Sequence, residues 1–444
     1  MPPAGKDEAL ALGYLFLLQR LLEFLRYRTD SGYPEAAKLI AEFQAHVVAR
    51  VEAGPFEQNE GEALPADVSA ALAGVLEECG GDFFLAAGSL IETGHAMPAQ
   101  TRAAMASALA DLGTSDLRGL AVLFLLDPDP SVRCPVAQAF ARVAASLSPV
   151  DVRRLIAMRN WRPDNERAEV DAIIRAARAA GVDCAQWEAG SVEAVSASAI
   201  DGVAAQGFLM ISPAGRKKRV SSILTKGGIA DAWSGEPESP RQIEASLIVA
   251  GMDARMLAVS RSYLDRMVAH HLALTIEKGE APPFGLLQAA ETIGGADWRP
   301  LRIVFADAVG ELLAEVPQAM CEPAAVASVL RKSDRLVDPA IVQCWFEDDP
   351  QAVEVVKQAR GRNRVRVADY LLQSVIARRR DRWAEIFLRT AAWMREAPPD
   401  AGLCWRQLTL VAKSLAEGRD MTEIALMRDI ALRTIEVLRN VDGR

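Results

Sequence analysis

The residues best suited to chemistry in this sequence are cations, and their first group is the run Arg216, Lys217, Lys218 and Arg219. The run follows Pro213-Ala-Gly, a turn sequence that separates two segments of bulky residues. Four cations at a hairpin turn are well placed to contact phosphate or an acidic protein surface. The alternative is a solvated turn whose charges discourage edge-to-edge pairing of strands.

A second basic segment lies between residues 360 and 382. Its candidate binding residues are Arg362, Arg366, Arg378, Arg379 and Arg382. On helices, Arg362 and Arg366 share a face, as do Arg378 and Arg382. Because arginine binds phosphate in a fork, the segment could build one stripe for nucleic acid along a groove. The alternative is intramolecular ion pairing, since three acidic residues lie close in sequence: Asp369, Asp381 and Glu385.

Motifs for catalysis, cofactors or metals are absent from the sequence. There is no Gly-x-Ser-x-Gly elbow and no phosphate loop. The adjacent His270 and His271 diverge on a helix and cannot readily chelate one ion, and the six cysteines form no CxxC pair. The sequence therefore predicts no metal and no cofactor, and it favours a binding function over an enzymatic one.

Composition narrows the class of protein. The 444 residues are half hydrophobic and carry a net charge of −9, which argues against non-specific coating of nucleic acid. The chain is too long for one ordinary core. Without a secretory signal or a run of eighteen apolar residues, it is predicted to be cytoplasmic and not membrane-bound.

Helical periodicity covers most of the sequence, with one interruption. Between residues 188 and 240 the period vanishes, and 205–212 and 219–224 are predicted to form a β-hairpin. A lone hairpin is marginal in water, so it needs a third strand near 192–200 or the flanking helices. The predicted domains are N-terminal helical repeats (1–187), a β-containing insertion (188–240) and C-terminal helical repeats (241–444).

The segment Asp127-Pro-Asp-Pro-Ser-Val-Arg133 is the clearest motif. Asp129 can cap the following helix and Pro130 suits its first turn. Residues 116–146 resemble a HEAT repeat, in which a Leu-rich helix ends at an Asp-Pro turn and the next opens with Val-Arg. The resemblance implies that Arg133 contacts an aspartate of an adjacent turn. It also implies a mainly α fold, a HEAT-like α-solenoid of antiparallel helix pairs with a small β-hairpin insertion.

Solenoids present extended concave surfaces on which charge selects partners. The main prediction is a non-enzymatic scaffold that binds a protein partner through a concave surface and the basic hairpin. The alternative is a DNA-binding or DNA-repair solenoid, because HEAT-like alkylpurine DNA glycosylases line a basic groove with Trp, Asp and Arg. Three tryptophans near the arginines fit that picture: Trp383, Trp393 and Trp405. Asp-Pro-x-Val-Arg repeats also occur in bilin lyases, which is a third interpretation.

Overall fold

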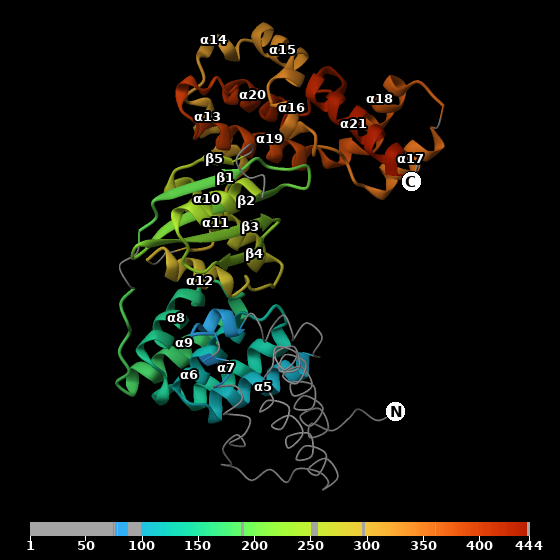
Figure 1. The fold of residues 1–444 in the computed structure, drawn as a ribbon. Coiled ribbons are helices and arrows are strands. Elements are labelled where there is room, and N and C mark those ends of the chain that lie inside the picture. Colours follow the sequence, from blue (N-terminus) through green and yellow to red (C-terminus); the bar gives the residue numbers. More distant parts are fainter. Residues whose placement is uncertain are drawn as a thin grey trace, which may run out of the picture. The chain divides into compact units, whose positions relative to one another are not determined.

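The computed structural model describes residues 74, 76–77, 79–87, 99–187, 191–249, 256–294, 298–359 and 361–441 (Figure 1). The chain divides into two compact units. Unit 1 comprises residues 1–188 and 276–288, and unit 2 comprises 189–275 and 289–444. The described part is mainly helical, which confirms the predicted class. Residues 1–73 of the predicted N-terminal domain lie outside the described residues, and the three predicted domain boundaries stay a prediction.

Unit 1 consists, where it is described, of short helices. They are α5 (Ala99–Leu112), α6 (Ser115–Ala121), η1 (Val122–Leu126), α7 (Pro130–Arg142), η2 (Ala144–Ser146), α8 (Pro149–Arg159) and α9 (Asp164–Ala179). Local chemistry sets where they begin: Asp129 accepts a hydrogen bond from the Ser131 N–H, and Ser148 forms a reciprocal capping box with Asp151. Helix α7 packs against both α5 and α9.

The Asp127–Arg133 motif joins these helices through buried charges. The Asp127 carboxylate accepts hydrogen bonds from Arg102 at 2.9 and 3.0 Å. Arg133, completely buried, donates to Glu166 of α9 at 2.7 and 2.9 Å. Arg133 also donates to the Asp127 backbone carbonyl at 2.7 Å, but no aspartate carboxylate is its ion-pair partner among the described residues. The longer glutamate of α9 fills that role and also accepts from Arg162.

Unit 2 contains a five-stranded antiparallel sheet in the order β4-β3-β2-β1-β5. The strands are β1 (Ala194–Ser198), β2 (Ala205–Ala214), β3 (Lys217–Lys226), β4 (Ile229–Ser234) and β5 (Met256–Ala258). The predicted hairpin is confirmed as β2 and β3, and β1 supplies the expected third strand. The predicted small insertion is corrected, because β5 comes from beyond residue 240 and pairs with β1.

Helices complete unit 2. They are α10 (Pro240–Val249), α11 (Arg261–Glu277), α12 (Gly285–Thr292), α13 (Phe305–Leu313), α14 (Gln318–Cys321), α15 (Pro323–Arg331), η3 (Ser333–Arg335), α16 (Pro339–Val342), α17 (Pro350–Gln358), α18 (Arg364–Ser374), η4 (Ile376–Arg379), α19 (Arg380–Arg395), η5 (Pro399–Ala401), α20 (Trp405–Ala416), η6 (Met421–Glu423) and α21 (Ala425–Val441). The first residues of α12 and the last two of α11 are counted with unit 1. Helix α19 packs against α20, and α21 packs against α18.

The sheet and the C-terminal helices share a core. Indole N–H groups of Trp345 and Trp393 donate to the Ile200 and Ala197 carbonyls at 2.8 and 3.0 Å. Tyr263 of α11 lies against Phe208 of β2, with ring centroids 6.3 Å apart. The β strands are therefore integral to unit 2, where the sequence had predicted an interruption between helical repeats.

Candidate functional site

The basic hairpin presents two of its four cations to solvent. Arg216 and Lys217 are exposed at the β2–β3 turn. The Lys218 ammonium forms an ion pair with Glu193, and Arg219 is half-buried opposite Ser212. Lys218 and Arg219 thus belong to the sheet, and among the described residues of this run the exposed cations without an ion pair are Arg216 and Lys217.

Arg378, Arg379 and Arg382 bind groups of their own chain. Arg379 lies 3.0 Å from Asp349, and Arg382 lies 3.2 Å from Glu347, whose carboxylate is completely buried. The hydrogen bond from the Gln351 backbone N–H, together with Arg379, holds the pKa of Asp349 below its ordinary value. Arg378 donates to the Gln351 side chain at 2.5 Å. Arg379 and Arg382 thus form intramolecular ion pairs, which was the alternative to a phosphate-binding stripe.

Arg362 and Arg366 are exposed beside a groove. The groove has a volume of about 640 Å³, and its walls come from the end of α17 and the start of α18. Neither guanidinium forms an ion pair within the described part of the chain. Tyr370, one turn further along α18, is 57% exposed at the same groove.

The predicted cations therefore do not form one stripe. Arg378 and Arg379 contact residues at the start of α17, whereas the groove of Arg362 and Arg366 adjoins its end. Helix α17, nine residues and about 13 Å long, lies between these two positions. The hairpin turn is further away: β2 begins next to α19 and runs for ten residues, about 33 Å, before it turns.

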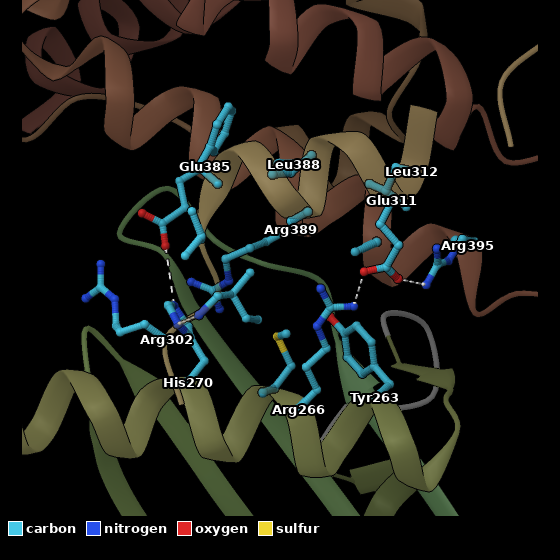
Figure 2. Close-up of a pocket in the computed structure, with 16 residues that line it drawn as sticks. Tyr263, Arg266, His270, Arg302, Glu311, Leu312, Glu385, Leu388, Arg389 and Arg395 are labelled. Atoms are coloured by element: carbon cyan, nitrogen blue, oxygen red, sulfur yellow. Dashed lines mark hydrogen bonds and ion pairs between the residues drawn. The ribbon is translucent and has the colours of Figure 1, made fainter. Parts of the chain in front are cut away.

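A pocket of about 310 Å³ lies where three helices of unit 2 meet (Figure 2). Each helix contributes one face to it: Tyr263, Arg266 and His270 from α11, Ala308, Glu311 and Leu312 from α13, and Glu385, Leu388, Arg389, Ala392 and Arg395 from α19. The segment 302–304 closes one side. None of these residues was a candidate from the sequence, although their spacing of three and four positions marks one face on each helix.

Two pocket carboxylates have cationic neighbours. Glu311 lies 2.7 Å from Arg266 and 3.0 Å from Arg395. Burial alone would raise the pKa of Glu311, but the hydrogen bonds from these arginines hold it below its ordinary value. Glu385 lies 3.6 Å from His270 Nε2, and this contact lowers the pKa of Glu385 in the same way. His270 Nδ1 accepts from the Ile303 N–H at 3.1 Å, so Nε2 carries the proton that faces Glu385.

Arg389 differs from the other charged residues of the pocket. Its side chain is 6% exposed, and Nη1 donates to the Ala204 carbonyl at 3.3 Å. Its Nε and Nη2 atoms are buried and have no hydrogen-bond partner within the described residues. Burial lowers the pKa of Arg389, because the guanidinium loses its hydration; the nearby Tyr263 and Glu385 oppose that effect. In Figure 2, Arg389 lies between the Glu385–His270 pair and the Arg266–Glu311–Arg395 group.

Two segments of the chain match family models. Residues 98–181 match the Y4lR second domain, and residues 306–439 match the Y4lR C-terminal helical domain. The chain is similar to Y4lR in these two domains. The uncharacterized protein y4lR of Sinorhizobium fredii is 26% identical over 301 residues, which cover 65% of this chain and 56% of that relative. The chain thus spans little more than half the length of y4lR. No solved structure matches.

The Y4lR matches correct the HEAT-like interpretation. Residues 116–146 lie within the Y4lR second-domain match, so their resemblance to a HEAT repeat was misleading. The physical reason is that Asp-Pro-Asp-Pro is a general device for ending one helix and capping the next. Arg133 then serves a buried ion pair rather than a repeat. The C-terminal Y4lR match contains α18 and α19, and hence both the groove and one wall of the pocket.

The described residues show neither a metal site nor a membrane span. Within them, no group of three His, Cys, Asp or Glu side chains is arranged to hold a metal ion. No helix among them is long and apolar enough to cross a membrane. All six cysteines are half-buried and unbridged. The cytoplasmic location stays a prediction.

Proposed function

We propose that this chain is a non-enzymatic binding protein whose partner is a protein with an acidic segment. The observation that carries the proposal is the groove beside α18, where Arg362 and Arg366 are exposed without ion pairs and Tyr370 projects next to them. Arginine and tyrosine are the residue types that dominate binding energy at protein interfaces. The proposal does not depend on an α-solenoid, since a groove between two helices is sufficient.

Charge favours a protein partner over DNA. The chain carries a net charge of −9, so a local cationic groove steers an acidic segment to one place and repels it elsewhere. A DNA-binding face needs several unpaired cations along the backbone of the duplex. Arg379 and Arg382 instead form ion pairs with Asp349 and Glu347. Fewer cations are therefore available to contact the phosphates of a DNA backbone.

Reversing charge at the groove is expected to weaken partner binding by at least about 30-fold, the effect of losing one hot-spot contact of about 2 kcal/mol. The variant is Arg362→Glu/Arg366→Glu, measured by affinity capture and then by titration of the captured partner. The matched control is Arg331→Glu/Lys332→Glu, which changes exposed cations at the end of α15 by the same net charge. Equal loss in both variants, or none in the first, would contradict the proposal.

DNA binding is a distinct outcome of the same tests. It requires retention on a duplex-DNA column at about 50 mM salt and a steep loss of retention as salt rises. If the wild type is retained in this way and Arg362→Glu/Arg366→Glu is not, the ligand of the groove is nucleic acid and not an acidic protein.

The hairpin turn supports a second, separate contact. Only Arg216 and Lys217 are exposed there without an ion pair within the described residues, so Arg216→Ser/Lys217→Ser tests the turn without disturbing the Lys218–Glu193 pair. We expect a two- to tenfold weaker association, largely through the on-rate, because exposed rim charges mainly steer encounter. The rate is measured by surface binding at two salt concentrations. An on-rate unchanged at low salt removes the hairpin from the interface.

A further inference from the structure

We propose that the pocket between α11, α13 and α19 binds a small organic acid, whose carboxylate is held by Arg389 and whose hydrocarbon part contacts the apolar wall. This site is separate from the α18 groove and does not rest on the proposed partner. Its ligand class follows from three observations: the free edge of one guanidinium, the charge balance of the pocket and the nature of its walls.

The free edge of Arg389 has the geometry of a carboxylate receptor. Nη1 is held by the Ala204 carbonyl, which leaves Nε and Nη2 without partners. These two N–H groups point along one side of the planar guanidinium, and that side matches the two oxygens of a carboxylate. Buried donors in native proteins are nearly always satisfied. Other arginines among the described residues have a single buried nitrogen without a hydrogen bond, but Arg389 has two on the same edge, the arrangement that a carboxylate can satisfy.

The carboxylates near Arg389 do not bind its Nε and Nη2 groups. Glu311 is shared by Arg266 and Arg395, and Glu385 faces His270. Glu385 and Asp201 influence Arg389 only over a distance, because neither carboxylate hydrogen-bonds to it. Arg395 also pairs with Glu315, outside the lining, at 3.1 Å. Arg389 has no carboxylate ion pair among the described residues, and its positive charge favours an anionic ligand over a neutral one.

The walls favour an organic acid over an inorganic anion. Met267, Val304, Leu312 and Leu388 line the same pocket, and apolar area gains free energy only against a hydrocarbon part of the ligand. The volume of about 310 Å³ lies at the low end for ligand sites, so the acid is small. Because Nε and Nη2 are each buried, binding requires a local movement that exposes them to the pocket.

Calorimetric titration and thermal denaturation of the full chain with hexanoate and benzoate test the proposal. We expect one binding site for at least one of these acids, a rise in Tm with its concentration, and no binding of hexan-1-ol or hexylamine. Inorganic phosphate, which has no hydrocarbon part, tests whether the anionic group alone accounts for binding. If phosphate binds as tightly as both acids, the hydrocarbon contact is wrong. If neither acid binds at millimolar concentration, the proposal is overturned.

The decisive variant is Arg389→Met, which keeps an unbranched side chain, shortens it and removes the charge. We expect at least a tenfold loss of acid affinity, together with a Tm of the ligand-free protein equal to or above that of the wild type. A merely structural Arg389 would give the opposite pair of results: a lower Tm and unchanged affinity. Arg389→Lys, which keeps the charge without the fork, should bind more weakly than the wild type.

A second variant avoids Arg389 altogether. Ala392→Phe narrows the pocket from α19, so it should weaken hexanoate more than acetate. An equal loss of affinity for hexanoate and acetate would show that the acid binds outside this pocket. The groove variant Arg362→Glu/Arg366→Glu should bind the acid as the wild type does, so a failure of the proposed partner and a failure of the pocket remain distinguishable.

Discussion

Replacing Glu166 with glutamine is expected to lower the free energy of unfolding by about 3–5 kcal/mol, the effect of breaking a buried ion pair from one side. Glu166 accepts hydrogen bonds from Arg133 at 2.7 and 2.9 Å and from Arg162 at 2.8 Å. Both guanidinium groups are completely buried. Without the carboxylate, two cations remain in the interior with no negative charge to balance them.

Urea denaturation followed by circular dichroism measures this effect on Glu166→Gln. The control is Asp164→Asn on the same helix, where an 83% exposed carboxylate pairs with Arg167 at 2.7 Å. An exposed pair of this kind contributes less than about 1 kcal/mol. If the two variants lose similar stability, the buried cluster does not have the assigned role.

The same cluster predicts a pH dependence. Burial raises the pKa of Glu166, but hydrogen bonds and charges from Arg133 and Arg162 outweigh it, so the folded pKa lies below the ordinary value of 4.5. A group with a lowered folded pKa stabilises the fold fully above its unfolded pKa and loses that effect as the pH falls through the folded pKa. The stability gap between the wild type and Glu166→Gln should therefore be constant near neutrality and shrink below about pH 4.5. A gap that widens on acidification would contradict the assignment.

Replacing Trp345 with alanine should lower the free energy of unfolding of unit 2 by about 3–5 kcal/mol, as for other large aromatic residues removed from a core. Its indole is completely buried, with ring centroids 5.4 Å from Phe387 and 6.4 Å from Trp383. Its N–H also donates to the Ile200 carbonyl at 2.8 Å. The substitution removes packing against α19 and a hydrogen bond to the β1–β2 connection together.

Two further variants separate these contributions. Trp345→Phe keeps an aromatic ring but leaves the Ile200 carbonyl unpaired, so a smaller loss of about 1–3 kcal/mol is expected. Trp233→Ala removes an indole that is 45% exposed on β4 and should have the least effect. Equal midpoints of denaturation for Trp345→Ala and Trp233→Ala would show that the sheet and the helices do not share the core described.

Local features of this protein were readable from its sequence. The cap at Asp129, the start of α7 at Pro130 and the β2–β3 hairpin depend on groups only a few positions apart. Their physics is short-range, because a side chain that caps a helix or forms a turn bonds to its own neighbourhood. The mainly helical class and the exposure of Arg216 and Lys217 followed from such patterns.

Pairings between distant residues were not readable in this way. Asp369 and Glu385 were expected to neutralise the nearby arginines, but they pair with Arg428 and His270 instead. The carboxylates that hold Arg379 and Arg382 come from 347 and 349, some thirty residues earlier in the chain. Many partners are chemically equivalent in a sequence with 59 acidic residues, so composition alone could not choose among them.

The sequence by itself determined where helices, caps and the hairpin form and that the chain carries clustered arginines. Only the tertiary structure decided which arginines remain unpaired. It placed Arg362 and Arg366 at an open groove and Arg389 in the interior with a vacant fork. The physical reason is that charge is a property of a residue, whereas desolvation and compensation are properties of everything that folds around it.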